Sequence, residues 1–352
     1  MRRRQAISTL GSFAGAALLG AGSAVRAQGV PAADRIVLGQ SAPFTGPAAE
    51  LGLQYHLGAQ LHFEAVNAKG GIQGRRIELQ RLDDGYEPER CAANTKQFIA
   101  QNVFALFGYV GTPTSLAALP LATEAKLPFF APFTGAQALR EPFNRYAIHV
   151  RASYFDETAA IVRQVTSIGI KKVAVFYQND AYGKSGLEGV QRALKPLNLE
   201  TAATGTVERN STDVAQAVKD ILAVRPEAIV QIGAYKACAT FVRLARQQGY
   251  AGNFYNVSFV GTQALLEELG AVAKGVAVSQ VMPFPYSPAT PISGEYLAAL
   301  KEQRGVSPNY SGMEGFVAAK VFVEALRRAG RGASREAFID AIGTLRDFNL
   351  GG

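Results

Sequence analysis

Short apolar runs and helical stretches alternate along the chain, and this alternation limits the possible folds more than any other feature of the sequence. Strands that alternate with helices form parallel sheets that are covered by helices on both faces. The alternation occurs as two series, over residues 35–150 and 156–281, and further helical stretches follow them. The sequence therefore predicts an α/β protein with two doubly wound lobes.

The predicted strands are short and apolar, as buried parallel strands are. In the first series they are expected at Arg35–Ala42, Arg76–Leu82, Val103–Gly108, Pro128–Ala131 and Arg145–Val150. In the second series they are expected at Lys172–Tyr177, Glu200–Thr206, Ala228–Gly233, Phe254–Asn256 and Val276–Val281. Ligands of doubly wound sheets bind in the loops that follow the carboxyl ends of strands, so candidate site residues are sought there.

Residues 1–27 have the layout of a cleavable secretory signal peptide. A basic start is followed by a stretch rich in Ala, Gly and Leu, and Val25-Arg26-Ala27 places small residues at the expected cleavage point. Arg3-Arg4 leaves both Sec and twin-arginine export open, and an amphipathic first helix is the alternative. We expect export to the periplasm, with cleavage near Ala27.

Composition argues against several classes of protein. The net charge is +8, but four basic residues and no acidic residue lie in the first 27 positions, so the body has only a mild, dispersed excess and nucleic acid is not an expected partner. Cys91 and Cys238 form no CxxC motif and only three histidines exist, so no metal or cofactor is expected. Gly183–Gly186 (GKSG) is neither a nucleophile elbow nor a phosphate loop. No catalytic constellation is found, and we expect a protein that is not an enzyme.

Hydroxyl side chains follow two strands of the first series. Gly111 and Thr112 lie in a loop that opens a helix, with Thr114 and Ser115 beside them, and Phe133 and Thr134 lie after the next strand. Hydroxyls together with the free N–H groups of a helix start can hold a carboxylate. Ordinary helix capping, and a turn with a core phenylalanine, are the alternative interpretations.

Tyrosines occupy the corresponding loops of the second series. Tyr154, Tyr182 and Tyr235 each come shortly after a predicted strand. A tyrosine ring offers flat apolar area and one phenolic hydrogen bond, which suits a small organic ligand. Burial in the core or exposure at the surface remains the alternative for each of them.

Several of these stretches together resemble one known family. The stretches are Phe44–Pro47 (FTGP), Asn67–Gly74 (NAKGGIQG), Asp83-Asp84, Asp180–Gly183 (DAYG) and the tyrosine that follows Gly233. From about Asp34 to Ala329 the chain is similar to the type I periplasmic binding proteins of ABC importers. The similarity is to the branched-chain amino acid group, which includes leucine/isoleucine/valine-binding and amide-binding proteins.

This resemblance implies two Rossmann-like lobes that close on a ligand about a hinge. Lobe one would comprise residues 28–149 and 281–345, and lobe two residues 150–280. The C-terminal end, 346–352, is expected to be truncated relative to the family. The partners implied are a small-molecule ligand and the membrane subunits of an ABC permease, with the protein itself a monomer.

The resemblance also assigns site residues. The carboxylate would be held at Gly111, Thr112, Phe133 and Thr134, and the second lobe would contribute Tyr182 and Tyr235. Ser258 stands where amino-acid-binding relatives place a glutamate for the ligand ammonium, and we expect no acidic residue nearby. An amino acid, an amide and an aromatic acid therefore all stay open as ligands.

The family's lobe-one disulfide would need cysteines where Tyr86 and Gly111 stand, so Cys91 and Cys238 are expected as buried free thiols on helices of different lobes. Two other functions stay open. One is a periplasmic ligand sensor that closes on its ligand in the same way and regulates a membrane partner, and the other is an exported α/β enzyme.

Overall fold

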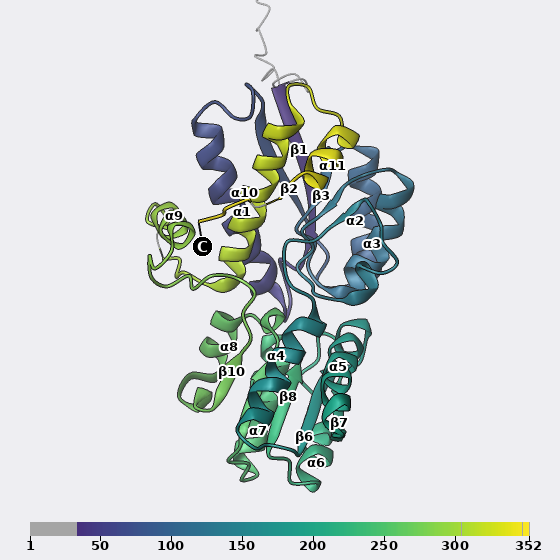
Figure 1. Ribbon diagram of the computed structural model, residues 1–352, viewed down its shortest axis with the longest axis vertical. Helices are drawn as coiled ribbons and strands as arrows, with labels where there is room; N and C mark the ends of the chain where they lie inside the picture. Colours follow the sequence, from purple (N-terminus) through teal and green to yellow (C-terminus); the bar gives the residue numbers. More distant parts are fainter. Residues whose placement is uncertain (1–33, 304, 347, 352) are drawn as a thin grey trace, which may run out of the picture. The chain divides into compact units, whose positions relative to one another are not determined.

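The computed structural model describes residues 34–303, 305–346 and 348–351, and the predicted signal peptide lies outside them. The strands form two five-stranded sheets in which every neighbouring pair is parallel (Figure 1). The first sheet has the order β2-β1-β3-β4-β5. Its strands are β1 (Arg35–Ala42), β2 (Arg76–Asp83), β3 (Ala105–Phe107), β4 (Phe129–Phe130) and β5 (Ala147–Ile148).

The second sheet repeats this topology with the order β7-β6-β8-β9-β10. Its strands are β6 (Val173–Gln178), β7 (Thr201–Val207), β8 (Ala228–Ile232), β9 (Asn253–Asn256) and β10 (Val276–Val278). In each sheet the strand order reverses next to the first strand, which is where doubly wound sheets bind ligands.

Helices of the first lobe come from both ends of the described chain. We call the first sheet and these helices the first lobe: α1 (Ala49–Ala68), α2 (Pro88–Ala100), α3 (Thr112–Glu124), α9 (Pro291–Leu300), α10 (Tyr310–Ala329) and α11 (Arg335–Gly343). Helices α1 and α10 lie side by side (Figure 1). A Cβ atom on Gly58 would overlap the backbone of Gly312, so glycine at this position allows the two helices to pack closely.

The second lobe is one continuous segment of chain. We call the second sheet and its helices the second lobe: α4 (Tyr154–Ser167), α5 (Ala181–Leu194), α6 (Ala215–Ala223), α7 (Tyr235–Gln247) and α8 (Thr262–Leu269). The chain enters this lobe after β5 and leaves it after β10. A Ser153 capping box starts α4, and the Asp180 side chain caps α5.

The core of the first lobe joins its sheet to the C-terminal helices. The Phe322 ring of α10 lies 5.8 Å from the Phe107 ring of β3 and 5.1 Å from the Phe130 ring of β4. Such edge-to-face contacts add to the free energy that burial of the rings contributes. The C-terminal helices therefore belong to the same lobe as the N-terminal strand β1.

Each predicted strand is found, and the differences lie at strand ends. The strand predicted over Arg145–Val150 is reduced to Ala147–Ile148, and that over Val276–Val281 ends at Val278. In both places the chain leaves the sheet to pass between the lobes, and a strand cannot continue without a neighbour.

Cys91 and Cys238 are buried and unpaired, as expected. Among the described residues, no helix is both long and apolar enough to cross a membrane.

Candidate functional site

Two threonines meet at the carboxyl ends of β3 and β4. Thr112 is the first residue of α3, and Thr134 lies in the loop after β4. Their hydroxyl oxygens are 2.7 Å apart, and both side chains are buried. Thr134 Oγ1 also accepts the backbone N–H of Ala136 at 3.3 Å. The structure therefore places a pair of hydroxyl donors beside the positive end of a helix dipole.

The neighbouring hydroxyls have different environments. Thr114 Oγ1 donates to the carbonyl of Gly111 at 3.0 Å, so it satisfies the backbone of its own helix. Ser115 Oγ is buried and has no hydrogen-bond partner among the described residues. The N-cap residue of α3 is Gly111, and within the described chain no side chain caps this helix. Helix capping therefore does not explain why a threonine occupies position 112. Ser115 is therefore a further hydroxyl available to a polar group in this loop.

Gly111 allows the loop to approach Tyr86. Its φ is +95°, and a Cβ atom at this position would overlap the Tyr86 ring. Only glycine adopts this backbone conformation readily. The turn that presents Thr112 thus depends on the glycine before it.

Aromatic rings connect the two lobes next to the threonines. The Tyr154 and Tyr182 rings are 5.3 Å apart, and Tyr182 lies 4.6 Å from Phe259. Phe259 of the second lobe lies 5.4 Å from Phe133 of the first. The Tyr154 backbone N–H also donates to the Gly135 carbonyl at 2.7 Å. We call Phe133, Tyr154, Tyr182 and Phe259 the aromatic cluster.

Burial keeps the phenols of this cluster protonated. It raises the pKa of Tyr154 to about 12, and the nearby Arg151 cation opposes part of this rise. Thr134 lowers the same pKa, but its hydroxyl makes no hydrogen bond of good geometry with the Tyr154 hydroxyl. Tyr182 donates a long hydrogen bond of 3.4 Å to the Gly233 carbonyl. The Tyr154 hydroxyl is therefore a buried neutral group that can donate to a ligand.

Tyr235 lies in a different environment from the other predicted tyrosines. It lines a surface hollow of about 390 Å³ together with Glu50, Lys236 and Glu268. No ring contact joins it to the aromatic cluster within the described part of the chain. Its assignment to the site stays a prediction.

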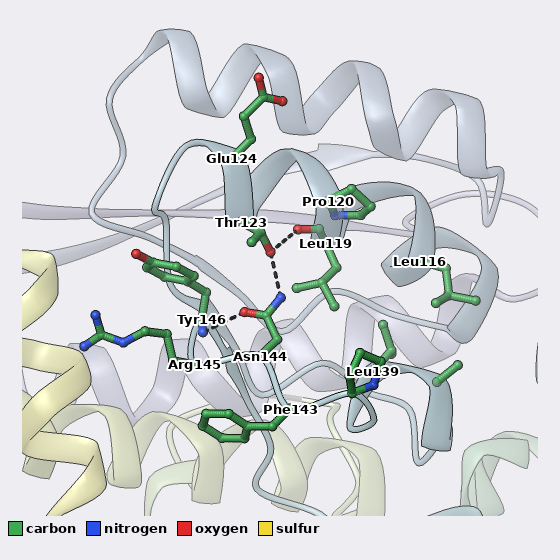
Figure 2. Close-up of a pocket in the computed structure, with 12 residues that line it drawn as sticks. Leu116, Leu119, Pro120, Thr123, Glu124, Leu139, Phe143, Asn144, Arg145 and Tyr146 are labelled. Atoms are coloured by element: carbon green, nitrogen blue, oxygen red, sulfur yellow. Dashed lines mark hydrogen bonds between the residues drawn. The ribbon is translucent and has the colours of Figure 1, made fainter.

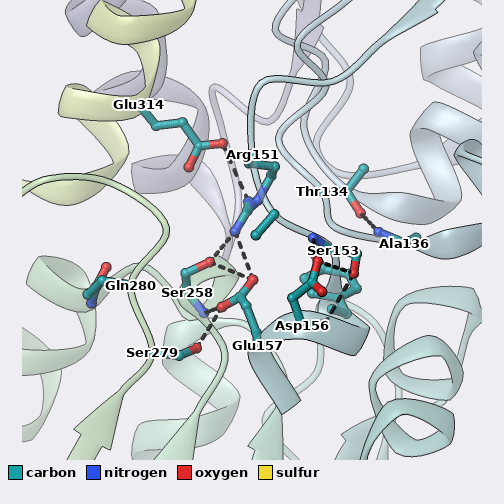
Figure 3. Close-up of polar contacts among 12 residues, drawn as sticks. Thr134, Ala136, Arg151, Ser153, Asp156, Glu157, Ser258, Ser279, Gln280 and Glu314 are labelled. Carbon is teal, nitrogen blue, oxygen red and sulfur yellow. Dashed lines mark hydrogen bonds and ion pairs between the residues drawn. The ribbon is translucent and has the colours of Figure 1, made fainter. Parts of the chain in front are cut away.

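Ser258 lies in a buried charged network that sequence reasoning missed (Figure 3). Its backbone N–H donates to Glu157 Oε2 at 2.7 Å, and its hydroxyl donates to Glu157 Oε1 at 3.0 Å. Arg151 Nη2 donates to Ser258 Oγ and to Glu157 Oε1. The expectation that no acidic residue lies near Ser258 is therefore wrong, because Glu157 reaches this loop from α4.

A second acid completes the network from the first lobe. Glu314 of α10 lies 3.6 Å from Arg151 Nη1. Burial raises the pKa of Glu314 to about 7, Arg151 lowers it, and the charge of Glu157 raises it further. We call Arg151, Glu157, Ser258 and Glu314 the charged network. It joins the segment between β5 and α4 to both lobes.

Polar contacts also join the lobes at the rim of the site. Arg209 Nη2 lies 2.9 Å from Glu87 Oε2, and Asn210 Nδ2 donates to Glu87 Oε1 at 2.7 Å and to the Gly85 carbonyl at 2.9 Å. We call Glu87, Arg209 and Asn210 the rim contact. It lies on the loops that follow β2 and β7.

Comparison with known proteins identifies the family. The family described as "Periplasmic binding protein" matches residues 35–352. The chain belongs to the periplasmic binding protein family.

Relatives of this periplasmic binding protein are found among sequences and solved structures. Leu/Ile/Val-binding protein homolog 7 of Brucella abortus (strain 2308) is 27% identical, over 87% of this chain and 80% of that protein. The structure of a possible leucine/isoleucine/valine-binding protein from Rhodopirellula baltica SH 1 superposes with a TM-score of 0.87 and 34% identity, over 91% and 89% of the two chains.

A fatty acid ABC transporter substrate-binding protein from Thermomonospora curvata has a TM-score of 0.82 and 25% identity, over 90% and 83% of the chains. The predicted fold, two α/β lobes of the type I periplasmic binding protein class, is confirmed by these likenesses. The family and these neighbours bind solutes and are not enzymes.

The periplasmic binding protein also has a surface groove outside the predicted site. It has a volume of about 730 Å³ and lies between α3 and residues 138–146 (Figure 2). Leu116, Leu139 and Phe143 contribute apolar walls, and Phe143 is 88% exposed. None of the predicted site residues lines this groove.

Sequence reasoning missed four residues of the candidate site: Arg151, Glu157, Phe259 and Glu314. Phe259 follows Ser258 in the loop after β9, and the strand pattern predicted the position of this loop correctly. The position of Phe259 in that loop could therefore have marked it as a candidate site residue. The charged residues carry no local motif, because they come from three separate segments of the chain.

Proposed function

We propose that this periplasmic binding protein captures a small carboxylate-bearing solute between its lobes and delivers it, chemically unchanged, to the permease of an ABC importer. The observation that carries this proposal is the position of the paired hydroxyls of Thr112 and Thr134 beside an aromatic cluster that both lobes supply. Amino acids, amides and aromatic acids are the solute classes considered.

The chemistry of the two sides is complementary to such a solute. On the first lobe, hydroxyls and the N-terminal N–H groups of α3 would donate to a carboxylate. On the second lobe, the rings of Tyr154 and Tyr182 would cover an apolar body. The names of the relatives support this class, since they include a Leu/Ile/Val-binding protein homolog, a possible leucine/isoleucine/valine-binding protein and a fatty acid ABC transporter substrate-binding protein.

Closure of the lobes would couple binding to delivery. The contacts between Phe133 and Phe259 and at the rim can form only when the two lobes are together. A solute that bridges the lobes stabilises that arrangement by its differential affinity for it. The protein would do so as a monomer in the periplasm, after removal of residues 1–27.

Ligand-linked stabilisation tests the proposal. Thermal unfolding is measured with matched amino acids, amides, and aliphatic and aromatic carboxylates. A solute that binds only the folded protein raises the melting temperature, and the shift grows with the ratio of its concentration to its Kd. At least one carboxylate should do so, and a panel without any carboxylate-linked shift contradicts the proposal. A second experiment uses the protein to capture partners from solubilised membranes. Capture of an ABC permease supports delivery of the solute, whereas capture of a sensor kinase favours the function of a ligand sensor.

A further inference from the structure

A buried cation borders the proposed ligand site. The Arg151 side chain is 1% exposed and lies in the segment that passes from the first lobe to the second. Its guanidinium carbon is 5.0 Å from the centre of the Phe133 ring and 5.9 Å from that of Tyr154. Both rings belong to the aromatic cluster, so a fixed positive charge lies next to the surfaces that a solute would contact.

Part of this guanidinium lacks hydrogen-bond acceptors. Nη2 donates to Ser258 and Glu157. Nη1 is 3.6 Å from Glu314, an ion pair that is longer than a hydrogen bond, and neither Nη1 nor Nε has a hydrogen-bond partner among the described residues. Buried donors are normally satisfied, so these N–H groups favour an additional acceptor. The buried hydroxyls of Ser115 and Tyr154 also lack partners there.

The acids of the charged network leave little capacity for a ligand cation. Glu157 accepts hydrogen bonds from the Ser258 backbone, the Ser258 hydroxyl, Arg151, and Ser279 at 2.6 Å (Figure 3). Both of its oxygens are therefore occupied. Glu314 is paired with Arg151, and burial favours its neutral form.

We propose that Arg151 determines the charge selectivity of the site, so that the preferred solutes are carboxylates without an ammonium group. Its free N–H groups would donate to an anion, whereas an ammonium would find no free acceptor in the charged network, because the acids of this network are already paired. This inference rests on the proposed function, because it assumes that the solute binds between the lobes.

Matched probes separate charge from shape. Dissociation constants are measured by calorimetry for sets that share one skeleton, such as phenylacetate, phenylacetamide, phenethylamine and phenylalanine, together with equivalent aliphatic sets. In the wild-type protein the carboxylate should bind about tenfold more tightly than its amide, and more tightly still than the amine or the amino acid. This comparison needs no variant.

Substitutions then assign the selectivity to Arg151. Arg151→Gln combined with Glu157→Gln removes both charges with nearly isosteric side chains and should bring the carboxylate-to-amide ratio close to one. Arg151→Lys keeps the charge and should keep most of the preference. Arg145→Gln is the matched control, because this partly exposed arginine pairs with Glu336 and Asp340 outside the site, and its ratio should equal that of the wild type.

The possible results distinguish the two proposals. If no carboxylate binds, the proposed function fails and the inference with it. If carboxylates bind but the neutral double variant keeps the wild-type ratio, or if an amino acid binds the wild type more tightly than the carboxylate without its ammonium, the inference alone is overturned. If the double variant does not fold, the wild-type comparison can still overturn the inference, and Arg151→Lys, which keeps the charge, should keep most of the preference.

Discussion

At the scale of single residues, the site depends on hydroxyls that are held in place by the turns before them. Thr112 and Thr134 lie on different loops, yet their oxygens are within hydrogen-bond distance. A carboxylate could replace this mutual hydrogen bond by accepting from both hydroxyls. Charge-assisted hydrogen bonds of this kind contribute more than neutral ones.

Loss of both hydroxyls should weaken carboxylate binding. Thr112→Ala with Thr134→Ala is expected to cost about 3 kcal/mol, or roughly a hundredfold in Kd. Calorimetry with the carboxylate that binds best to the wild type measures this. Thr166→Ala is the control, because that hydroxyl donates to the Val162 and Arg163 carbonyls within α4, away from the site. An unchanged Kd in the double variant would remove these threonines from the site.

Glu314 should make folding stability depend on pH near neutrality. Its pKa is about 7 in the folded protein, above the ordinary 4.5. Between these values the folded state holds a proton that the unfolded state has released, so this contribution to stability is present at low pH and is lost as pH rises toward and past 7. Its size is up to about 3 kcal/mol.

The groups that face Glu314 are Arg151, Glu157 and the buried Tyr55 of α1. Glu314→Gln should remove the decline, so that urea unfolding from pH 5 to 8 shows the wild type losing stability relative to the variant. Glu324→Gln, which removes an acid paired with Arg328 near the end of α10, is the control. Parallel pH curves for wild type and Glu314→Gln would contradict the assignment.

At the scale of elements, strands could be predicted well because buried parallel strands are short apolar runs with turn residues after them. The loops that follow β3 and β4 were therefore placed correctly, and with them Thr112 and Thr134. Strand ends were less predictable, since β5 and β10 stop where their neighbours stop, a property of the sheet and not of the residues.

The charged network could not be predicted for a related reason. Arg151, Glu157 and Glu314 come from an inter-lobe segment, α4 and α10, and no local periodicity relates them. Their meeting is a consequence of how α10 returns to the first lobe. Sequence patterns report which residues share a face of one element, but they do not report which distant elements meet.

The turn before α3 should tolerate only glycine at position 111. Gly111→Ala is expected to cost about 2–4 kcal/mol, because the positive φ strains alanine and the new methyl group overlaps the Tyr86 ring. Gly169→Ala is the matched control. Gly169 also has a positive φ, of 88°, but open space around it, so strain alone should cost about 1 kcal/mol. Urea unfolding measures both, and equal costs would show that the contact with Tyr86 is unimportant.

At the scale of the whole molecule, two groups of polar contacts join the lobes, in addition to the aromatic cluster. The charged network lies at the segment between the lobes, and the rim contact joins the loops after β2 and β7. Glu87 is central to the rim contact because its two oxygens bind Arg209 and Asn210. The rim contact includes none of the residues proposed to touch the solute, so it would affect affinity through closure alone.

Weakening the rim contact should lower affinity without altering selectivity. Glu87→Gln is expected to weaken carboxylate binding roughly fivefold, since a partly exposed ion pair contributes about 1 kcal/mol. Glu295→Gln, which removes a comparable pair with Lys320 inside the first lobe, should leave Kd unchanged. Calorimetry gives both constants. A Glu87→Gln protein that binds as tightly as the Glu295→Gln control would show that the rim contact does not support closure.

The crystal structure of the protein with its tightest-binding carboxylate tests the central claim most directly. We expect the carboxylate oxygens within hydrogen-bond distance of the Thr112 and Thr134 hydroxyls, with the rings of Tyr154 and Tyr182 against the rest of the solute. Electron density for the solute in the groove between α3 and residues 138–146, or anywhere else outside the space between the lobes, would contradict it.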